Sequence, residues 1–247
     1  MTRTYDTRPA AGVPADDRPA VLPASTLVRL IGKPAAEWSV EDLMRLVPAL
    51  GIRLVSLMHV GGEGWAKTLD FVPRDLKHLH EVLVAGERAD GSSLFGDLGI
   101  PVGASDIVLR PRIATAFLDP FADQPTLVLL AAHYGRDGAP LAQSPTTLVE
   151  LAYERLKRET GVDMHALGEV EFFLGKRPED TDVYGAGDRG YHASSPFVFG
   201  ERMRREALCV LAEIGVPVKY GHSEVGHIQP DADALVKQAA ASNVLNP

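Results

Sequence analysis

The amino-acid sequence predicts an α+β protein, and two observations lead to that fold class. Two strand-like runs, residues 53–60 and 65–72, flank the glycine-rich turn Gly61–Gly64 and predict an antiparallel hairpin. Helical segments lie on both sides of this hairpin, and short strand candidates follow them along the chain. The first ordered part of the chain is therefore expected to be a mixed sheet with a helix across it.

Capping and turn residues predict the elements around the hairpin. Residues 1–24 are rich in Pro, Ala, Asp and Arg without apolar periodicity, so a disordered tail is expected there. Ser39 is a suitable N-cap for a helix that runs to about Leu50. A second helix is expected over residues 74–85. The glycine-rich residues 86–105 are expected to form a loop.

The later elements follow the same signals. The pattern predicts strands at residues 107–109, 115–118, 126–133, 166–174 and 216–220, and helices at residues 147–159 and 200–214. Pro145 and Gly161 mark the start and the end of the first of these helices. The Ala-rich stretch up to Pro247 is expected to be a solvated tail.

The composition is that of an ordinary globular protein. Of 247 residues, 45% are hydrophobic and 23% are charged. The net charge of −8 argues against a general nucleic-acid binder, because such a protein needs a basic face. The single cysteine, Cys209, excludes an internal disulfide. Because the apolar runs are too short to cross a bilayer and the N-terminus lacks a secretory pattern, we expect a cytoplasmic protein.

Two glutamates form the strongest chemical pattern in the chain. Glu169 and Glu171 alternate with apolar residues, so in a strand both carboxylates lie on one face. If that strand is central, the two charges need a cation, and hard oxygen ligands favour Mg²⁺ or Mn²⁺. The spacing alone favours the other explanation, an edge strand whose polar face meets water.

Two further segments are candidates of lower specificity. His222 and Glu224 share a strand face and could complete a set of metal ligands, although a solvated strand end explains them as well. The run from Asp90 to Ser93 is a turn whose paired serines can satisfy backbone groups. The sequence contains neither a P-loop nor a dinucleotide fingerprint, and it has no paired Cys/His spacing for zinc.

Taken together and in order, these segments resemble the glutamine synthetase family. The resemblance covers about residues 30 to 225 and is carried by Asp90-Gly91-Ser92-Ser93, by Ser105 to Pro111 with Thr115 to Phe121, by Gly168-Glu169-Val170-Glu171-Phe172-Phe173, by Gly190-Tyr191, and by His222-Ser223-Glu224-Val225. In the last segment a serine stands where the family has a second histidine.

The resemblance implies a fold and a reaction. It implies a β-grasp domain over residues 25–135, followed by an incomplete α/β catalytic domain over residues 136–247. It also implies that ATP phosphorylates the γ-carboxylate of glutamate and that ammonia displaces the phosphate. The family forms homo-oligomeric rings in which the aspartate loop completes the active site of a neighbouring subunit.

The resemblance also implies roles for particular residues. Glu171 and Glu224 would hold one Mg²⁺ or Mn²⁺ ion, and Glu169 would hold the other. Asp90 would bind ammonium and help to remove its proton. Tyr191, Ser92 and Ser93 would contribute to substrate binding, and His222 would lie nearby.

The chain departs from the family pattern after its last motif. No glutamate follows Glu224 and no arginine follows Arg205, whereas the family places further metal-binding glutamates and substrate-binding arginines downstream. We therefore expect little or no glutamine synthesis from this chain alone. Two alternatives stay open: a non-catalytic homologue that assembles or binds metal without turnover, and a ligase for another amine.

Overall fold

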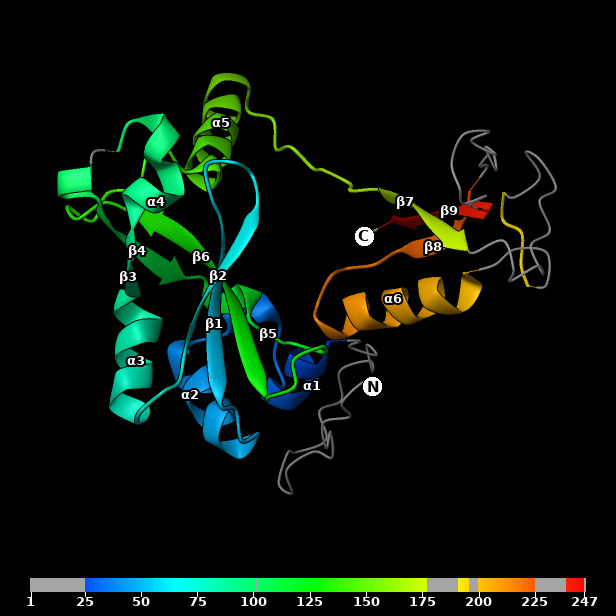
Figure 1. The fold of residues 1–247 in the computed structure, drawn as a ribbon, viewed down its shortest axis with the longest axis horizontal. Coiled ribbons are helices and arrows are strands. Elements are labelled where there is room, and N and C mark those ends of the chain that lie inside the picture. Colours follow the sequence, from blue (N-terminus) through cyan, green and yellow to red (C-terminus); the bar gives the residue numbers. More distant parts are fainter. Residues whose placement is uncertain (1–24, 101, 177–190, 196–199, 225–238, 247) are drawn as a thin grey trace. The chain divides into compact units, whose positions relative to one another are not determined.

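The computed structural model describes residues 25–100, 102–176, 191–195, 200–224 and 239–246 (Figure 1). By its internal contacts the chain divides into two compact units, Met1–Met164 and His165–Pro247. The expected tail over residues 1–24 lies outside the described residues, and the expected domain boundary at residue 135 stays a prediction.

A mixed sheet of six strands forms the centre of the first unit. Its strand order is β2-β1-β6-β4-β3, and β5 pairs with β6. The strands are β1 (Leu54–Val60), β2 (Ala66–Phe71), β3 (Glu87–Asp90), β4 (Asp106–Pro111), β5 (Phe117–Leu118) and β6 (Thr126–Tyr134). Because β1 runs antiparallel to β2 and parallel to β6, the predicted hairpin and the predicted mixed sheet are both confirmed.

Helices cover this sheet. They are α1 (Thr26–Ile31), α2 (Val40–Ala49), α3 (Leu76–Ala85), α4 (Gly91–Phe95) and α5 (Pro145–Thr160), with short 3-10 turns η1 (Ala35–Glu37), η2 (Gly96–Leu98), η3 (Val102–Ala104) and η4 (Ile113–Thr115). The predicted cap at Ser39 is present as a capping box, in which the Ser39 N–H donates to Asp42 Oδ2 at 2.8 Å.

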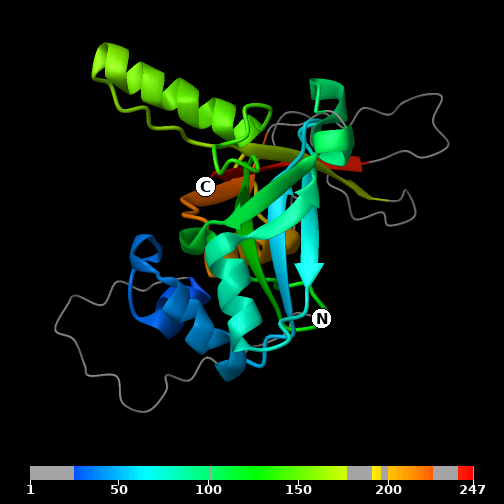
Figure 2. The same cartoon turned by 90° about the vertical axis from the view of Figure 1, so that its left-hand side faces the viewer.

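The core of the first unit lies between the sheet and helices α2 and α3. Figures 1 and 2 show both helices against one face of the sheet. Leu57 of β1 and Leu129 of β6 are fully buried there, in one cluster with Leu43 of α2 and Leu79 of α3. Burial of these side chains removes apolar surface from water, which is the main force that holds the unit together.

The loop predicted for residues 86–105 is wrong in part. Residues 87–90 form β3, in which Glu87 lies opposite Leu109 and Asp90 opposite Asp106 of β4. This strand has no alternation of apolar and polar residues, so its pairing with β4 decides its conformation. Helix α4 follows directly, and Asp90 is its N-cap.

The second unit contains a three-stranded sheet and helix α6 (Glu201–Glu213). The strand order is β7-β9-β8, and the strands are β7 (Val170–Lys176), β8 (Tyr220–Ser223) and β9 (Ala239–Asn246). The expectation of a solvated tail is wrong over residues 239–246, because β9 pairs with both other strands. The strands predicted at residues 166–174 and 216–220 begin later, at Val170 and Tyr220.

Candidate functional site

The junction of β3 and α4, residues 90–93, is called the Asp90 loop below, and it places one carboxylate among hydroxyl groups. Ser93 Oγ donates to Asp90 Oδ2 at 2.6 Å, and Ser92 Oγ donates to Asp90 Oδ1 at 2.8 Å. The Ser92 N–H also donates to Oδ1 at 3.0 Å. Asp90 is exposed, as predicted for this loop. The structure therefore brings together the three predicted residues Asp90, Ser92 and Ser93.

Gly91 fixes this loop to the neighbouring strand. Its N–H donates to the Ser105 carbonyl at 2.7 Å, and a Cβ at this position would lie 2.7 Å from the same oxygen and from Ile107 Cγ2. Only glycine allows so close an approach, which explains why glycine follows Asp90. In the sequence, Gly91 is part of a turn signal and of the segment that resembles the family, but nothing there indicates this close approach.

A cavity of about 360 Å³ lies beside the loop. Its walls include Ser92 and Ser93, the acidic side chains of Glu63 and Asp97, and Phe95. Lys67 Nζ lies 2.8 Å from Glu63 Oε1 and neutralises part of that charge. The cavity is thus lined by two serines of the Asp90 loop and is acidic on balance, and its negative charge favours a cation.

The hydroxyl groups keep Asp90 ionised. Hydrogen bonds from Ser93, then Ser105, then Ser92 hold the pKa of Asp90 well below its ordinary value of 3.8. We expect Ser93→Ala to raise this pKa toward 3.8, because the variant loses the hydroxyl with the largest effect. The measurement is a pH titration of the Asp90 carboxyl carbon by NMR. An unchanged titration curve in the variant would contradict this explanation.

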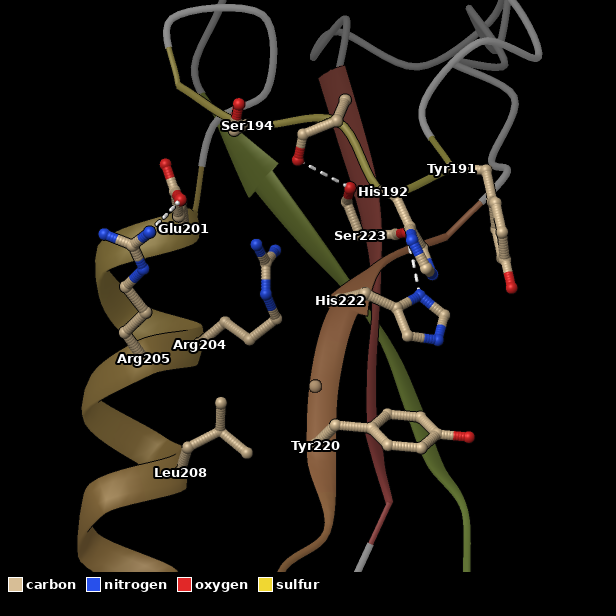
Figure 3. Close-up of a pocket in the computed structure, with 12 residues that line it drawn as sticks. Tyr191, His192, Ser194, Glu201, Arg204, Arg205, Leu208, Tyr220, His222 and Ser223 are labelled. Carbon is tan, nitrogen blue, oxygen red and sulfur yellow. Dashed lines mark hydrogen bonds and ion pairs between the residues drawn. The ribbon is translucent and has the colours of Figure 1, made fainter.

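A cluster of aromatic rings and imidazoles lies on the second unit's sheet (Figure 3). Tyr191 stacks on His192 with ring centroids 4.3 Å apart, and Tyr191 meets His222 edge-on at 5.1 Å. His222 Nδ1 lies 3.8 Å from Glu224 Oε2. The predicted residues Tyr191, His222 and Glu224 are therefore close together.

Strand β8 and helix α6 border a cavity of about 480 Å³, and the predicted residues Tyr191 and His222 contribute to its lining. Figure 3 shows Arg204 and Leu208 extending from α6 toward β8, while Tyr220 and His222 point away from the helix. Arg204 is 5% exposed, and burial lowers the pKa of its guanidinium. Ser223, where the family has histidine, is buried and donates to the Ala193 carbonyl at 2.9 Å.

The three predicted metal ligands are not gathered into one group. Glu171 and His222 both lie opposite Val244 of β9, so the alternation places Glu169, Glu171 and Glu224 toward the same side of the sheet. However, β9 separates β7 from β8, and two strand spacings amount to about 10 Å. Among the described residues no group of three His, Cys, Asp or Glu side chains could hold a metal ion. The metal-binding roles of these residues therefore stay a prediction.

A buried chain of polar groups in the first unit was missed by the sequence analysis. His133 Nε2 lies 3.1 Å from His59 Nδ1, and His133 Nδ1 lies 2.9 Å from Ser144 Oγ. All three residues are buried. The available signal was a histidine near the end of each of two apolar strands, but nothing in either strand alone indicates that the two rings meet.

Comparison with curated proteins gives relatives that match most of this chain. A glutamine synthetase of Methanocaldococcus jannaschii is 26% identical and covers 80% of the chain, and one of Azospirillum brasilense is 32% identical and covers 64%. A 3-hydroxylaminophenol mutase of Cupriavidus pinatubonensis is 30% identical over 76% of the chain. The matches cover 45%, 40% and 45% of these relatives, so the chain spans less than half of their length.

Solved structures share the fold. The Plasmodium falciparum glutamine synthetase matches 84% of this chain and 44% of its own, with a TM-score of 0.58 and 15% identity. A structure described as GmaS without ligand matches 83% of this chain and 44% of its own, with a TM-score of 0.59 and 14% identity. No family model matches the chain.

The chain thus has an α+β fold that matches part of the solved glutamine synthetases. It is a relative of the glutamine synthetase family over about four fifths of its length, and the resemblance seen in its motifs is confirmed. No helix in the described part of the chain is long and apolar enough to cross a membrane.

Proposed function

We propose that this chain supplies the ammonium-binding part of a ligase that joins ammonia to the γ-carboxylate of glutamate, with ATP as the source of an acyl phosphate. One observation carries the proposal: Asp90 is an exposed and strongly acidic carboxylate, held by Ser92 and Ser93 beside a small acidic cavity. The family relationship supports the reaction class.

The electrostatics suit the holding of ammonium more than the removal of its proton. A carboxylate with a pKa far below the usual range stays charged and attracts a cation, but it is a weak base. Asp90 would therefore bind and orient ammonium through its two oxygens. Because ammonium has no lone pair, it must lose one proton before its nitrogen can attack, and a group more basic than Asp90 would take that proton.

Ammonium binding by the 247-residue chain tests this proposal. We expect NH₄⁺ to shift the backbone amide resonances of Asp90, Ser92 and Ser93 in a saturable way, with a dissociation constant in the millimolar range. Asp90→Asn should abolish the shifts because it removes the charge. Asp137→Asn is the matched control, since Asp137 is an exposed loop aspartate in another part of the unit. Equal shifts with tetramethylammonium, which has no N–H donor, would contradict the assignment.

The Mg²⁺ or Mn²⁺ implied by the resemblance stays a prediction for this chain. Glu169, Glu171 and Glu224 lie toward one side of the sheet, on two strands that β9 separates, so a shared metal ion would need their side chains to converge. The same holds for the roles of Tyr191 and His222. Their closeness to Glu224 supports a common site without defining its ligand.

We also propose that the Asp90 loop lies between copies of the chain in a homo-oligomeric ring. The exposure of Asp90 and Ser93 supports this, because a loop that completes a neighbouring site must reach the surface. Light scattering after gel filtration measures the oligomeric state. A chain that stays monomeric at high concentration would contradict the proposal.

Activity of the purified chain is expected to be absent or very low. The assay is release of phosphate that depends on glutamate, ATP and ammonia. Phosphoryl transfer requires that the negative charges of the phosphate groups be neutralised. Among the described residues, no group of three His, Cys, Asp or Glu side chains lies close enough to hold a metal ion that would do so. Robust turnover that is lost in Glu171→Ala would contradict this expectation.

A second candidate function follows from the mutase relative. Its 30% identity is as high as that of several synthetases, so the related chemistry need not be ligation. Conversion of 3-hydroxylaminophenol by the purified chain, without ATP, distinguishes the two candidates.

A further inference from the structure

The first unit contains a continuous chain of polar contacts inside an otherwise apolar region. His59 on β1, His133 on β6 and Ser144 at the N-cap of α5 are linked through the two nitrogens of the central ring. The His133 side chain is fully buried and His59 is 5% exposed. Ser144 makes no side-chain cap bond to its own helix, so its hydroxyl serves His133 instead. The proposed ammonium site uses none of these three residues.

This series of polar contacts adjoins helix α4 through the side chain of Phe95. The Phe95 ring meets His133 edge-on, with ring centroids 4.9 Å apart and an interplanar angle of 90°. Phe95 is 1% exposed, and its neighbour Leu94 accepts a hydrogen bond from the Gly62 N–H at 3.0 Å. The α4 backbone that follows Asp90 is therefore attached through Phe95 to the imidazole pair.

The two imidazoles, His59 and His133, can accept at most one added proton before one of their two hydrogen-bond contacts is lost. With both rings neutral, each of the two contacts has one hydrogen and one acceptor. A first proton on His133 leaves both contacts possible but puts a charge in a buried place. A second proton would set two N–H groups against each other at 3.1 Å. Lys67, which pairs with Glu63, adds positive charge near His59.

We propose that His59 and His133 act as a pH-sensitive clamp on helix α4, which holds the Asp90 loop most firmly while both rings are neutral. His133 is then a positioning residue, because it acts on Asp90 through Phe95 and touches no substrate. The consequence for ammonium rests on the function proposed for Asp90, whereas the clamp itself does not.

The direction of the pH effect follows from burial. Desolvation first, and the neighbouring ring second, lower the pKa of His133 to about 4, and the pKa of His59 is lowered as well. An opened loop regains imidazoles with an ordinary pKa of about 6.5. The clamp is therefore complete above pH 6.5 and weakens as the pH falls from there toward 4. Opening becomes about tenfold easier per pH unit for each extra proton that the open form binds.

Hydrogen exchange on the 247-residue chain tests the clamp. We expect the protection of the amides of residues 92–95, corrected for the intrinsic effect of pH, to fall about tenfold or more between pH 6.5 and 5. His133→Gln should remove most of this fall, because glutamine keeps a donor and an acceptor but does not titrate. His59→Gln should reduce the fall only in part, because His133 stays buried with its lowered pKa. His80→Gln is the matched control, since His80 is exposed on α3.

Three results would overturn the clamp. The first is protection that does not depend on pH in the wild-type chain, and the second is a pH dependence that both glutamine variants retain in full. The third is an equal loss at the central amides of Leu57 and Leu129, which would mean that the whole unit opens. If instead the clamp behaves as expected and NH₄⁺ shifts no resonance, the function proposed for Asp90 fails and the clamp stands.

Discussion

Replacement of Gly86 with alanine is expected to lower the free energy of unfolding of the first unit by about 3 kcal/mol or more. Gly86 has φ 84° and ψ −172°, a conformation that other residues scarcely adopt. A Cβ there would also lie 2.3 Å from the Leu109 carbonyl oxygen, in the strand that pairs with β3. The backbone must therefore move, and the buried Leu109 side chain must move with it. Urea denaturation measures the change.

Gly51→Ala separates the two causes of this loss. Gly51 also has a positive φ, 61°, but a Cβ there meets nothing within 4 Å. The left-handed conformation alone should cost about 1 kcal/mol. If Gly86→Ala and Gly51→Ala destabilise the unit equally, the close contact with Leu109 has no effect and the explanation is wrong.

Replacement of Gly91 with alanine is expected to weaken ammonium binding at Asp90 by more than about tenfold. The added methyl group would meet the Ser105 carbonyl and the Ile107 side chain at 2.7 Å, so the loop must move away from β4. That movement breaks the Gly91 N–H bond to Ser105 and displaces Asp90 from the Ser105 hydroxyl. The NMR titration with NH₄⁺ measures the effect.

Gly103→Ala is the control for this variant. Gly103 lies in η3, outside the walls of the cavity beside the Asp90 loop, and a Cβ at this position meets nothing within 4 Å. Alanine should therefore leave ammonium binding unchanged. Unchanged binding in Gly91→Ala would show that the position of the loop against β4 does not matter.

Local signals in the sequence predicted much of the first unit. The Ser39 cap, the Gly61–Gly64 turn and the Pro145 helix start each act through neighbouring residues, and the structure contains all three elements. Strands β3 and β9 were missed because their residues show no alternation, and pairing with partners far along the chain makes them strands.

The geometry of the candidate site was likewise predictable only where it depends on residues that are neighbours in the sequence. Asp90, Ser92 and Ser93 interact within one turn, so the sequence contains their geometry. Alternation placed Glu169 and Glu171 on one face, but it could not indicate that β9 lies between them and Glu224. The contact between His59 and His133 depends on the register of β1 against β6, which a sequence pattern does not specify.

The parallel pairing of β1 with β6 has a consequence for the order in which the protein can fold during synthesis. Leu54 pairs with Thr126, so β1 leaves the ribosome long before its central neighbour exists. Until then the nascent chain can form the β1–β2 hairpin and helices α2 and α3, but β1 keeps one unpaired edge of apolar strand. Closure of so long a segment is slow, and exposed edges of this kind favour association between chains. Between the emergence of β1 and that of β6, this edge is therefore open to association with other chains.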